Sequence, residues 1–166
     1  MALTRAVVVV TVLAAASAAG WWLGDQRRTA NPRARVVEAI DGDTVVVAFS
    51  DGSTDTVRLL GVDTPETHDP RKPVQCFGPE AAAFTRARLT GRVVQLVDDI
   101  ESRDLYGRRL SYVLLDGEPF EEVLLRRGYA RLLVIAPNVE HARAFLADEL
   151  AARRHRRGLW GACGEE

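Results

Sequence analysis

The chain has 166 residues, 47% hydrophobic and 27% charged, which is enough apolar material for one folded domain and excludes wholesale disorder. Its formal net charge of −1 argues against tight, non-specific binding of nucleic acid through a broad positive surface. An enzyme that must release its products does not need such a basic surplus.

The first predicted element is an uncharged run from Ala6 to Gly24, which follows Arg5. It is just long enough to span a bilayer, which takes roughly 20 residues, and Ala16-Ser17-Ala18 fits a signal-peptidase site. We expect residues 1–24 to be a signal peptide or an N-terminal membrane anchor, either of which exports the domain; a buried core helix is the alternative. The domain is then secreted, or anchored outside through residues 6–24. Residues 25–33 are polar and are expected to form a linker.

Three β-strands are expected next, because β-branched residues are frequent and short turns rich in Asp and Gly separate them. They cover residues 35–40, 44–49 and 54–62. A long, Pro-rich loop over residues 63–78 follows, and a loop of that length in a compact domain is usually functional or disordered.

Helices appear in the second half of the chain. Pro79 begins one that ends near Leu89, since Pro is favoured in the first turn. The remaining expected elements are strands at 92–97 and 109–115, a short helix at 119–127 ended by Gly128, and a last helix capped by Asn138. Five strands and three helices in this order predict a mainly β fold with α (α+β), a five-stranded OB-fold barrel.

Two carboxylates stand at strand ends that an antiparallel meander can bring together. Asp43 begins one predicted strand, and Asp63 ends the next. With a backbone carbonyl they form a hard oxygen site suited to Ca²⁺. The alternative is that both are ordinary turn and strand-end residues.

Two arginines complete the parts needed for phosphodiester hydrolysis. Arg58 lies in an otherwise apolar strand, and Arg108 follows a turn. Each alone is typical of a solvated side chain. Beside a metal and a carboxylate base, two guanidiniums can hold the charge that builds on phosphate oxygens, because their planar forks bond two oxygens at once.

At these positions the sequence resembles the staphylococcal nuclease (thermonuclease) family. The matching stretches are Ala39 to Val45, Arg58 to Thr67, Phe77 to Ala81, Asp104 to Arg108, and Gly158-Leu159-Trp160. They occur in unbroken order over residues 34–161, which we take as the domain, with 162–166 as a C-terminal tail.

The resemblance implies an OB-type barrel and a calcium-dependent nuclease that cuts DNA, RNA or both and leaves 3′-phosphate ends. The implied Ca²⁺ ligands are Asp43, Asp63 and the backbone carbonyl of Thr64, the implied catalytic residues are Arg58, Glu66 and Arg108, and Tyr106 is assigned to substrate binding. The alternative is a non-catalytic nucleic-acid- or protein-binding barrel, but such relatives typically lose the catalytic triplet. Nothing in the sequence demands an oligomer, so we expect a monomer.

Two departures from the family pattern affect binding and stability. The family's best-known member stacks two tyrosines on the nucleotide base, and counting from Gly128 places Val134 and Ala136 at those positions. Cys76 and Cys163 match cysteines that exported relatives commonly carry together, which implies a disulfide between them. Two unrelated thiols are the alternative.

Overall fold

The computed structural model describes residues 31–67 and 73–163. From Pro32 onward the chain forms one compact unit. The predicted signal or anchor segment 1–24 lies outside the described residues, as does most of the predicted linker. Within the described ranges, no helix has both the length and the apolar character to cross a membrane.

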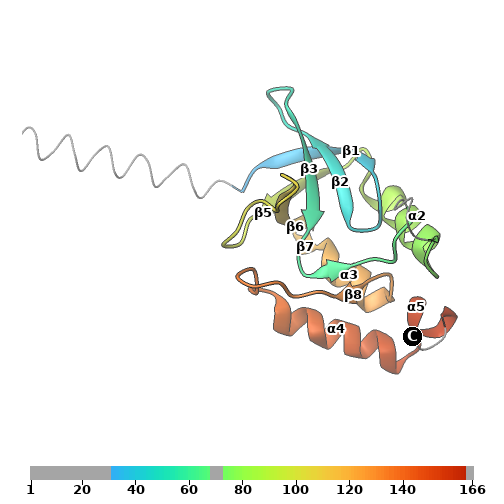
Figure 1. The fold of residues 1–166 in the computed structure, drawn as a ribbon. Coiled ribbons are helices and arrows are strands. Elements are labelled where there is room, and N and C mark those ends of the chain that lie inside the picture. Colours follow the sequence, from blue (N-terminus) through green and yellow to red (C-terminus); the bar gives the residue numbers. More distant parts are fainter. Residues whose placement is uncertain (1–30, 68–72, 164–166) are drawn as a thin grey trace, which may run out of the picture. The chain divides into compact units, whose positions relative to one another are not determined.

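The unit contains eight strands and four helices in its described part. They are β1 (Arg33–Ala39), β2 (Thr44–Ala48), β3 (Thr54–Leu59), β4 (Val62–Asp63), α2 (Gly78–Leu89), β5 (Val93–Val97), β6 (Arg109–Leu115), β7 (Glu118–Pro119), α3 (Phe120–Arg127), β8 (Arg131–Leu132), α4 (Ala142–Arg154) and α5 (Leu159–Ala162) (Figure 1).

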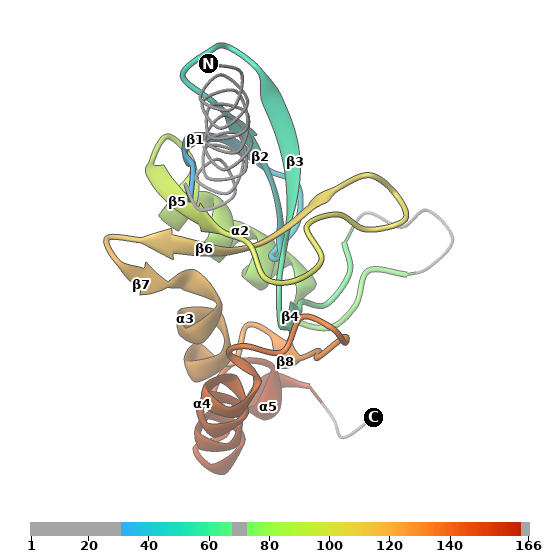
Figure 2. The ribbon, with the colours of Figure 1, turned by 90° about the vertical axis from the view of Figure 1, so that its left-hand side faces the viewer.

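Five of the strands close into a barrel, as the sequence predicts. They are antiparallel neighbours in the order β3-β2-β1-β5-β6. The parallel pairing of β3 with β6, where Val57 is opposite Arg109, closes the sheet (Figure 2). The three longer helices are α2, α3 and α4. The fold is therefore the α+β, OB-type barrel with three helices that the element order indicates.

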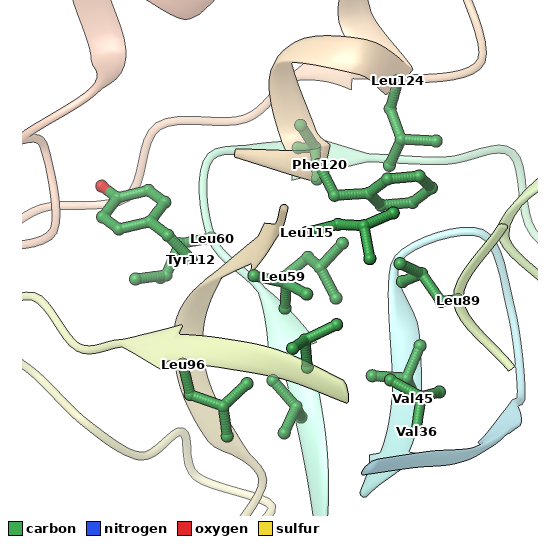
Figure 3. Packing of buried hydrophobic residues seen from close by; sticks show 14 of the residues in the cluster. Val36, Val45, Leu59, Leu60, Leu89, Leu96, Tyr112, Leu115, Phe120 and Leu124 are labelled. Carbon is green, nitrogen blue, oxygen red and sulfur yellow. The ribbon is translucent and has the colours of Figure 1, made fainter. Parts of the chain in front are cut away.

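The core fills the barrel and continues to the helices that pack on it. Val36, Val45 and Leu59 from the strands are almost completely buried, together with Phe120 and Leu124 of α3 (Figure 3). Burial of side chains of this size stabilises the fold by roughly 1.5–3 kcal/mol each. Leu59 belongs to this core, so the C-terminal end of β3 is fixed by packing.

The predicted third strand is interrupted at Gly61, and β4 is a separate short strand paired with β8. Gly61 has a φ of +76°, and a Cβ there would lie 2.7 Å from the ring of Phe145. Only glycine accommodates both the backbone conformation and this contact. After the break, Asp63 pairs with Arg131 of β8.

The prediction that Asn138 caps the last helix is wrong. Helix α4 begins at Ala142, and its N-cap residue, His141, makes no side-chain cap. The side chain of Asn138 instead bonds both backbone groups of Glu101: its Oδ1 accepts from the Glu101 N–H at 2.8 Å and its Nδ2 donates to the Glu101 carbonyl at 2.8 Å. Two segments 37 residues apart are thereby joined.

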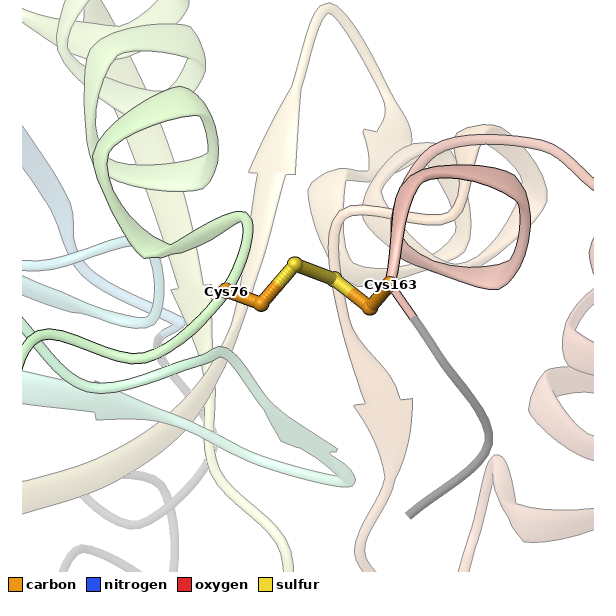
Figure 4. Close-up of a disulfide and its surroundings, with 2 residues drawn as sticks. All are labelled: Cys76 and Cys163. Carbon is orange, nitrogen blue, oxygen red and sulfur yellow. A yellow bond between two sulfur atoms is a disulfide. The ribbon is translucent and has the colours of Figure 1, made fainter.

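A disulfide joins Cys76, just before α2, to Cys163, just after α5 (Figure 4). The pairing that the resemblance implies is therefore present in the structure. It connects the end of the long loop to the C-terminal end of the domain.

Candidate active site

The turn between β1 and β2 presents Asp43 from a buried position. Its Oδ2 accepts hydrogen bonds from the Thr64 N–H at 2.8 Å and the Thr64 hydroxyl at 2.9 Å, and its Oδ1 accepts one from the Thr44 hydroxyl at 3.0 Å. The backbone carbonyl of Asp43 also accepts from the Leu59 N–H. Asp43 therefore fixes Thr64 against the start of β2, although the two are 21 positions apart.

Arg58 lies between the two predicted metal-binding carboxylates. Its Nη2 is 3.4 Å from Asp43 Oδ2 and 3.0 Å from Asp63 Oδ1, while its Nη1 donates to the carbonyls of Leu59 and Val62. The side chain is only 14% exposed. The Arg58 side chain is therefore largely buried and fixed by these contacts, and it is not solvated.

Burial and nearby charges of both signs act on Asp63. Partial removal from water raises the pKa of Asp63, the charge of Asp43 raises it further, Arg58 lowers it, and Glu66 raises it again. The charges of Asp43 and Glu66 are therefore close enough to disfavour the ionised form of Asp63. A bound cation would relieve this repulsion.

Glu66 follows on the loop after β4. One oxygen of its carboxylate accepts a hydrogen bond from the Thr67 N–H at 2.8 Å, and the Thr67 hydroxyl donates to Asp41. Asp41, which the sequence assigns only to a turn, thus supports the residue beside Glu66.

Arg108 is held by Asp104. Its Nε donates to Asp104 Oδ2 at 2.7 Å, and its backbone N–H donates to Asp104 Oδ1 at 2.9 Å. Partial burial opposes the effect, but these hydrogen bonds lower the pKa of Asp104. Tyr106 is 86% exposed, and its ring lies 5.5 Å from the Arg108 guanidinium carbon.

Both predicted catalytic arginines line one cleft of about 540 Å³. Tyr106, the predicted substrate-binding residue, lines it as well. The other lining residues are Leu59, Leu60, Gly61, Val62, Glu101, Arg103, Asp104, Leu105, Leu110, Leu133, Ile135 and Asn138. Asp43 and Asp63 do not line this cleft themselves, but both contact Arg58, which does.

Val134 and Ala136, which the count from Gly128 places at the family's two base-stacking positions, do not line the cleft. The cleft is lined instead by Leu133 and Ile135, which are 38% and 63% exposed. In an extended segment side chains alternate between faces, and the Leu133 N–H bonds the Gly61 carbonyl, which fixes the face that the segment presents. The segment after Gly128 therefore presents Leu133 and Ile135 to the cleft.

Sequence reasoning missed two residues that shape the cleft. Asp104 belongs to one of the family motifs, and an Asp four positions before a functional Arg at a Gly turn was a usable signal. Asn138 gave no such signal, because its partner, Glu101, is remote in the sequence.

The oxygen atoms at this site are of the kind that Ca²⁺ binds. Two carboxylates, Asp43 and Asp63, share one guanidinium nitrogen, and Thr64 is hydrogen-bonded to Asp43. These are the oxygen ligands that Ca²⁺ prefers, with water completing its shell. No group of three or more His, Cys, Asp or Glu side chains in the described ranges is arranged to bind a metal, so a backbone carbonyl and water would have to supplement the two carboxylates.

Comparison with known proteins identifies relatives of this chain. Residues 56–162 match the family model described as staphylococcal nuclease homologue. The chain is 40% identical over 126 residues to a thermonuclease of Staphylococcus hyicus, covering 76% of this chain and 74% of the relative. It is also 40% identical over 125 residues to a thermonuclease of Staphylococcus intermedius (75% and 74%) and 41% identical over 128 residues to endonuclease YncB of Bacillus subtilis (76% and 60%).

Proposed function

Because this chain belongs to the staphylococcal nuclease family and is a hydrolase of nucleic-acid phosphodiester bonds, we propose that it requires Ca²⁺ and leaves 3′-phosphate ends. The observation that carries the proposal is that Arg58 and Arg108 line one cleft, with the Asp43 and Asp63 carboxylates in contact with Arg58. This arrangement puts two guanidinium groups beside an acidic oxygen site.

The ligands we propose for Ca²⁺ are Asp43, Asp63 and the backbone carbonyl of Thr64. The raised pKa of Asp63, caused by its partial removal from water and by Asp43 and Glu66, supports a site in which a divalent cation stabilises the ionised forms. The bound ion offsets the negative charge of the phosphate.

Glu66 takes a proton from the attacking water in the proposed mechanism. Its carboxylate is already held by the Thr67 N–H, so little reorganisation is needed. Arg58 and Arg108 donate to the non-bridging phosphate oxygens, where charge accumulates during attack on phosphorus. The oxygen of the attacking water bonds to phosphorus, the bond to the 5′-oxygen breaks, and that oxygen takes up a proton from solvent water and leaves as a hydroxyl, so the phosphate stays on the 3′ side.

Arg108 is well suited to this role because Asp104 uses its Nε. Within residues 31–67 and 73–163, no hydrogen bond or ion pair occupies its two Nη groups, so both remain available to a phosphate. Arg58 is a partner both of the phosphate and of the two proposed metal-binding carboxylates, which its guanidinium already contacts.

We propose that the substrate is DNA, RNA or both, and that its bases lie against Tyr106 and the aliphatic side chains Leu133 and Ile135. Aliphatic side chains lack the face-to-face stacking that contributes roughly 1–3 kcal/mol per base. Binding by this cleft is therefore expected to depend mainly on phosphate contacts, and to weaken strongly with salt.

The domain arrangement and location are also proposals. Residues 34–161 form the nuclease domain, with 1–24 as signal peptide or anchor, 25–33 as linker and 162–166 as tail. Export as a monomer, secreted or membrane-attached through residues 6–24, is supported by the uncharged N-terminal run and by the disulfide, which persists in oxidising compartments.

The proposal is tested by a plasmid-nicking assay with Ca²⁺, Mg²⁺ or a chelator. We expect activity with Ca²⁺, little with Mg²⁺, whose rigid octahedral shell fits an open carboxylate site badly, and none with chelator. Product ends that become extendable by a polymerase only after phosphatase treatment identify 3′-phosphates. Equal turnover with chelator contradicts the metal assignment.

A further inference from the structure

Both backbone polar groups of Glu66 are bonded to a single residue, Gln75. The Glu66 N–H donates to the Gln75 side-chain Oε1 at 2.7 Å. The Gln75 N–H donates to the Glu66 carbonyl at 3.0 Å. The position and the peptide orientation of Glu66 therefore depend on a residue nine positions later in the chain.

The segment after Gln75 also packs directly on the Glu66 backbone. Gly78 donates its N–H to the Gln75 carbonyl at 3.0 Å. A Cβ at Gly78 would lie 3.0 Å from the Pro65 carbonyl oxygen and 3.2 Å from that of Glu66. The start of α2 is therefore in close contact with the peptide groups on both sides of Glu66, and a side chain at the position of Gly78 would collide with them.

This segment is anchored to the rest of the domain by two contacts that are remote in the sequence. Cys76, the residue after Gln75, is joined by the disulfide to Cys163 (Figure 4). Phe77, with a φ of +68°, packs its ring 5.5 Å from that of Tyr129. Gln75 is therefore placed by the C-terminal part of the domain as much as by its own loop.

We propose that Gln75 is a positioning residue for Glu66, and that the Cys76–Cys163 disulfide holds Gln75 in that place. The inference rests on the proposed function, in which Glu66 takes a proton from water. Gln75 is exposed, so its hydrogen bonds contribute little to stability. A small displacement of a catalytic group nevertheless lowers turnover by a large factor.

The first test compares two variants of Gln75 in the full-length, calcium-loaded enzyme. Gln75→Met keeps the volume but removes the acceptor; we expect kcat to fall about tenfold with KM nearly unchanged. Gln75→Glu keeps an acceptor oxygen at the same place, and we expect it to recover most of the loss. A wild-type kcat in Gln75→Met, or no recovery in Gln75→Glu, overturns the positioning role, as does a loss that appears only in Tm.

The second test asks whether the disulfide acts through Gln75. Cys76→Ser with Cys163→Ser should lower kcat more than it raises KM, when measured well below the variant's Tm. Combined with Gln75→Met, the loss in kcat should be no larger than for Gln75→Met alone, because both changes release the same residue. If the two losses in kcat multiply in the combined variant, the disulfide does not act through Gln75, and this part of the proposal is overturned.

Glu66→Gln in the same assay separates this inference from the function on which it rests. A nearly inactive Glu66→Gln enzyme supports the base assignment, and a wild-type kcat in Gln75→Met then counts against the positioning role alone. An active Glu66→Gln enzyme removes the base assignment, and the inference with it.

Discussion

Replacement of Arg108 by lysine tests the catalytic assignment most directly. Asp104 Oδ2 lies 2.7 Å from Arg108 Nε, and the guanidinium extends beyond this contact with both Nη groups. A lysine ammonium within reach of Asp104 is expected to be held by that carboxylate. Arg108→Lys therefore loses the bidentate fork while keeping the net charge.

The expected loss in kcat follows from the hydrogen-bond donor that Arg108→Lys removes from the phosphate. Removal of a preorganised donor to a developing oxyanion costs about 3 kcal/mol, or roughly a hundredfold in kcat. Single-turnover cleavage of a defined oligonucleotide measures this step without the contribution of product release. KM should change far less than kcat.

The neighbouring residue provides a matched control. Arg109 pairs with Asp98, with Nη2 at 2.6 Å from Oδ2, and does not line the cleft. Arg109→Lys should therefore keep kcat within about threefold of wild type. Equal effects of the two substitutions, or a wild-type kcat in Arg108→Lys, refute the reasoning.

Three further predictions concern stability and binding. Burial raises the pKa of Glu121 to about 8 in the folded protein, above its unfolded value. The contribution of Glu121 to the free energy of unfolding is therefore complete below pH ~4.5 and is lost as the pH rises towards 8. Glu121→Gln should thus exceed wild type in free energy of unfolding by about 3 kcal/mol at pH 7 and match it near pH 4, as measured by urea denaturation. Loss of the Cys76–Cys163 bridge, which spans 87 positions, should lower the free energy of unfolding by about 4.5 kcal/mol at most, from the chain-entropy model. Leu133→Tyr with Ile135→Tyr should lower the Kd for a nucleoside diphosphate about tenfold or more in calorimetry, because stacking replaces aliphatic contact.

Each of these predictions has an opposing result. A Glu121→Gln variant whose advantage does not change with pH contradicts the raised pKa. Two free thiols in mass spectrometry of non-reduced, exported protein reject the bridge. Val134→Tyr with Ala136→Tyr is the control for the cleft, and tighter binding by this pair than by the Leu133 and Ile135 pair would reverse the assignment of the faces.

Local sequence patterns were sufficient for much of the fold. The predicted strand 109–115 coincides with β6, α2 begins within one residue of the expected position, and α3 ends at Arg127, as expected. Pro79 and Gly128 explain this accuracy, because a first-turn proline and a left-handed glycine act on their own neighbours. The motifs around Arg58 and Arg108 likewise led to the family, since each lies within one short segment.

Contacts between remote segments had to come from the tertiary structure. The sequence alone identified the chain as a nuclease of this family and identified its candidate catalytic residues. It did not reveal that Leu133 and Ile135 face the cleft or that Asn138 hydrogen-bonds both backbone groups of Glu101. Nor did it reveal that the acidic residue Glu121 in the first turn of α3 is fully buried. The physical reason is that burial and facing depend on strand register and on which distant surface covers a residue. Those are decided only when the barrel closes between β3 and β6.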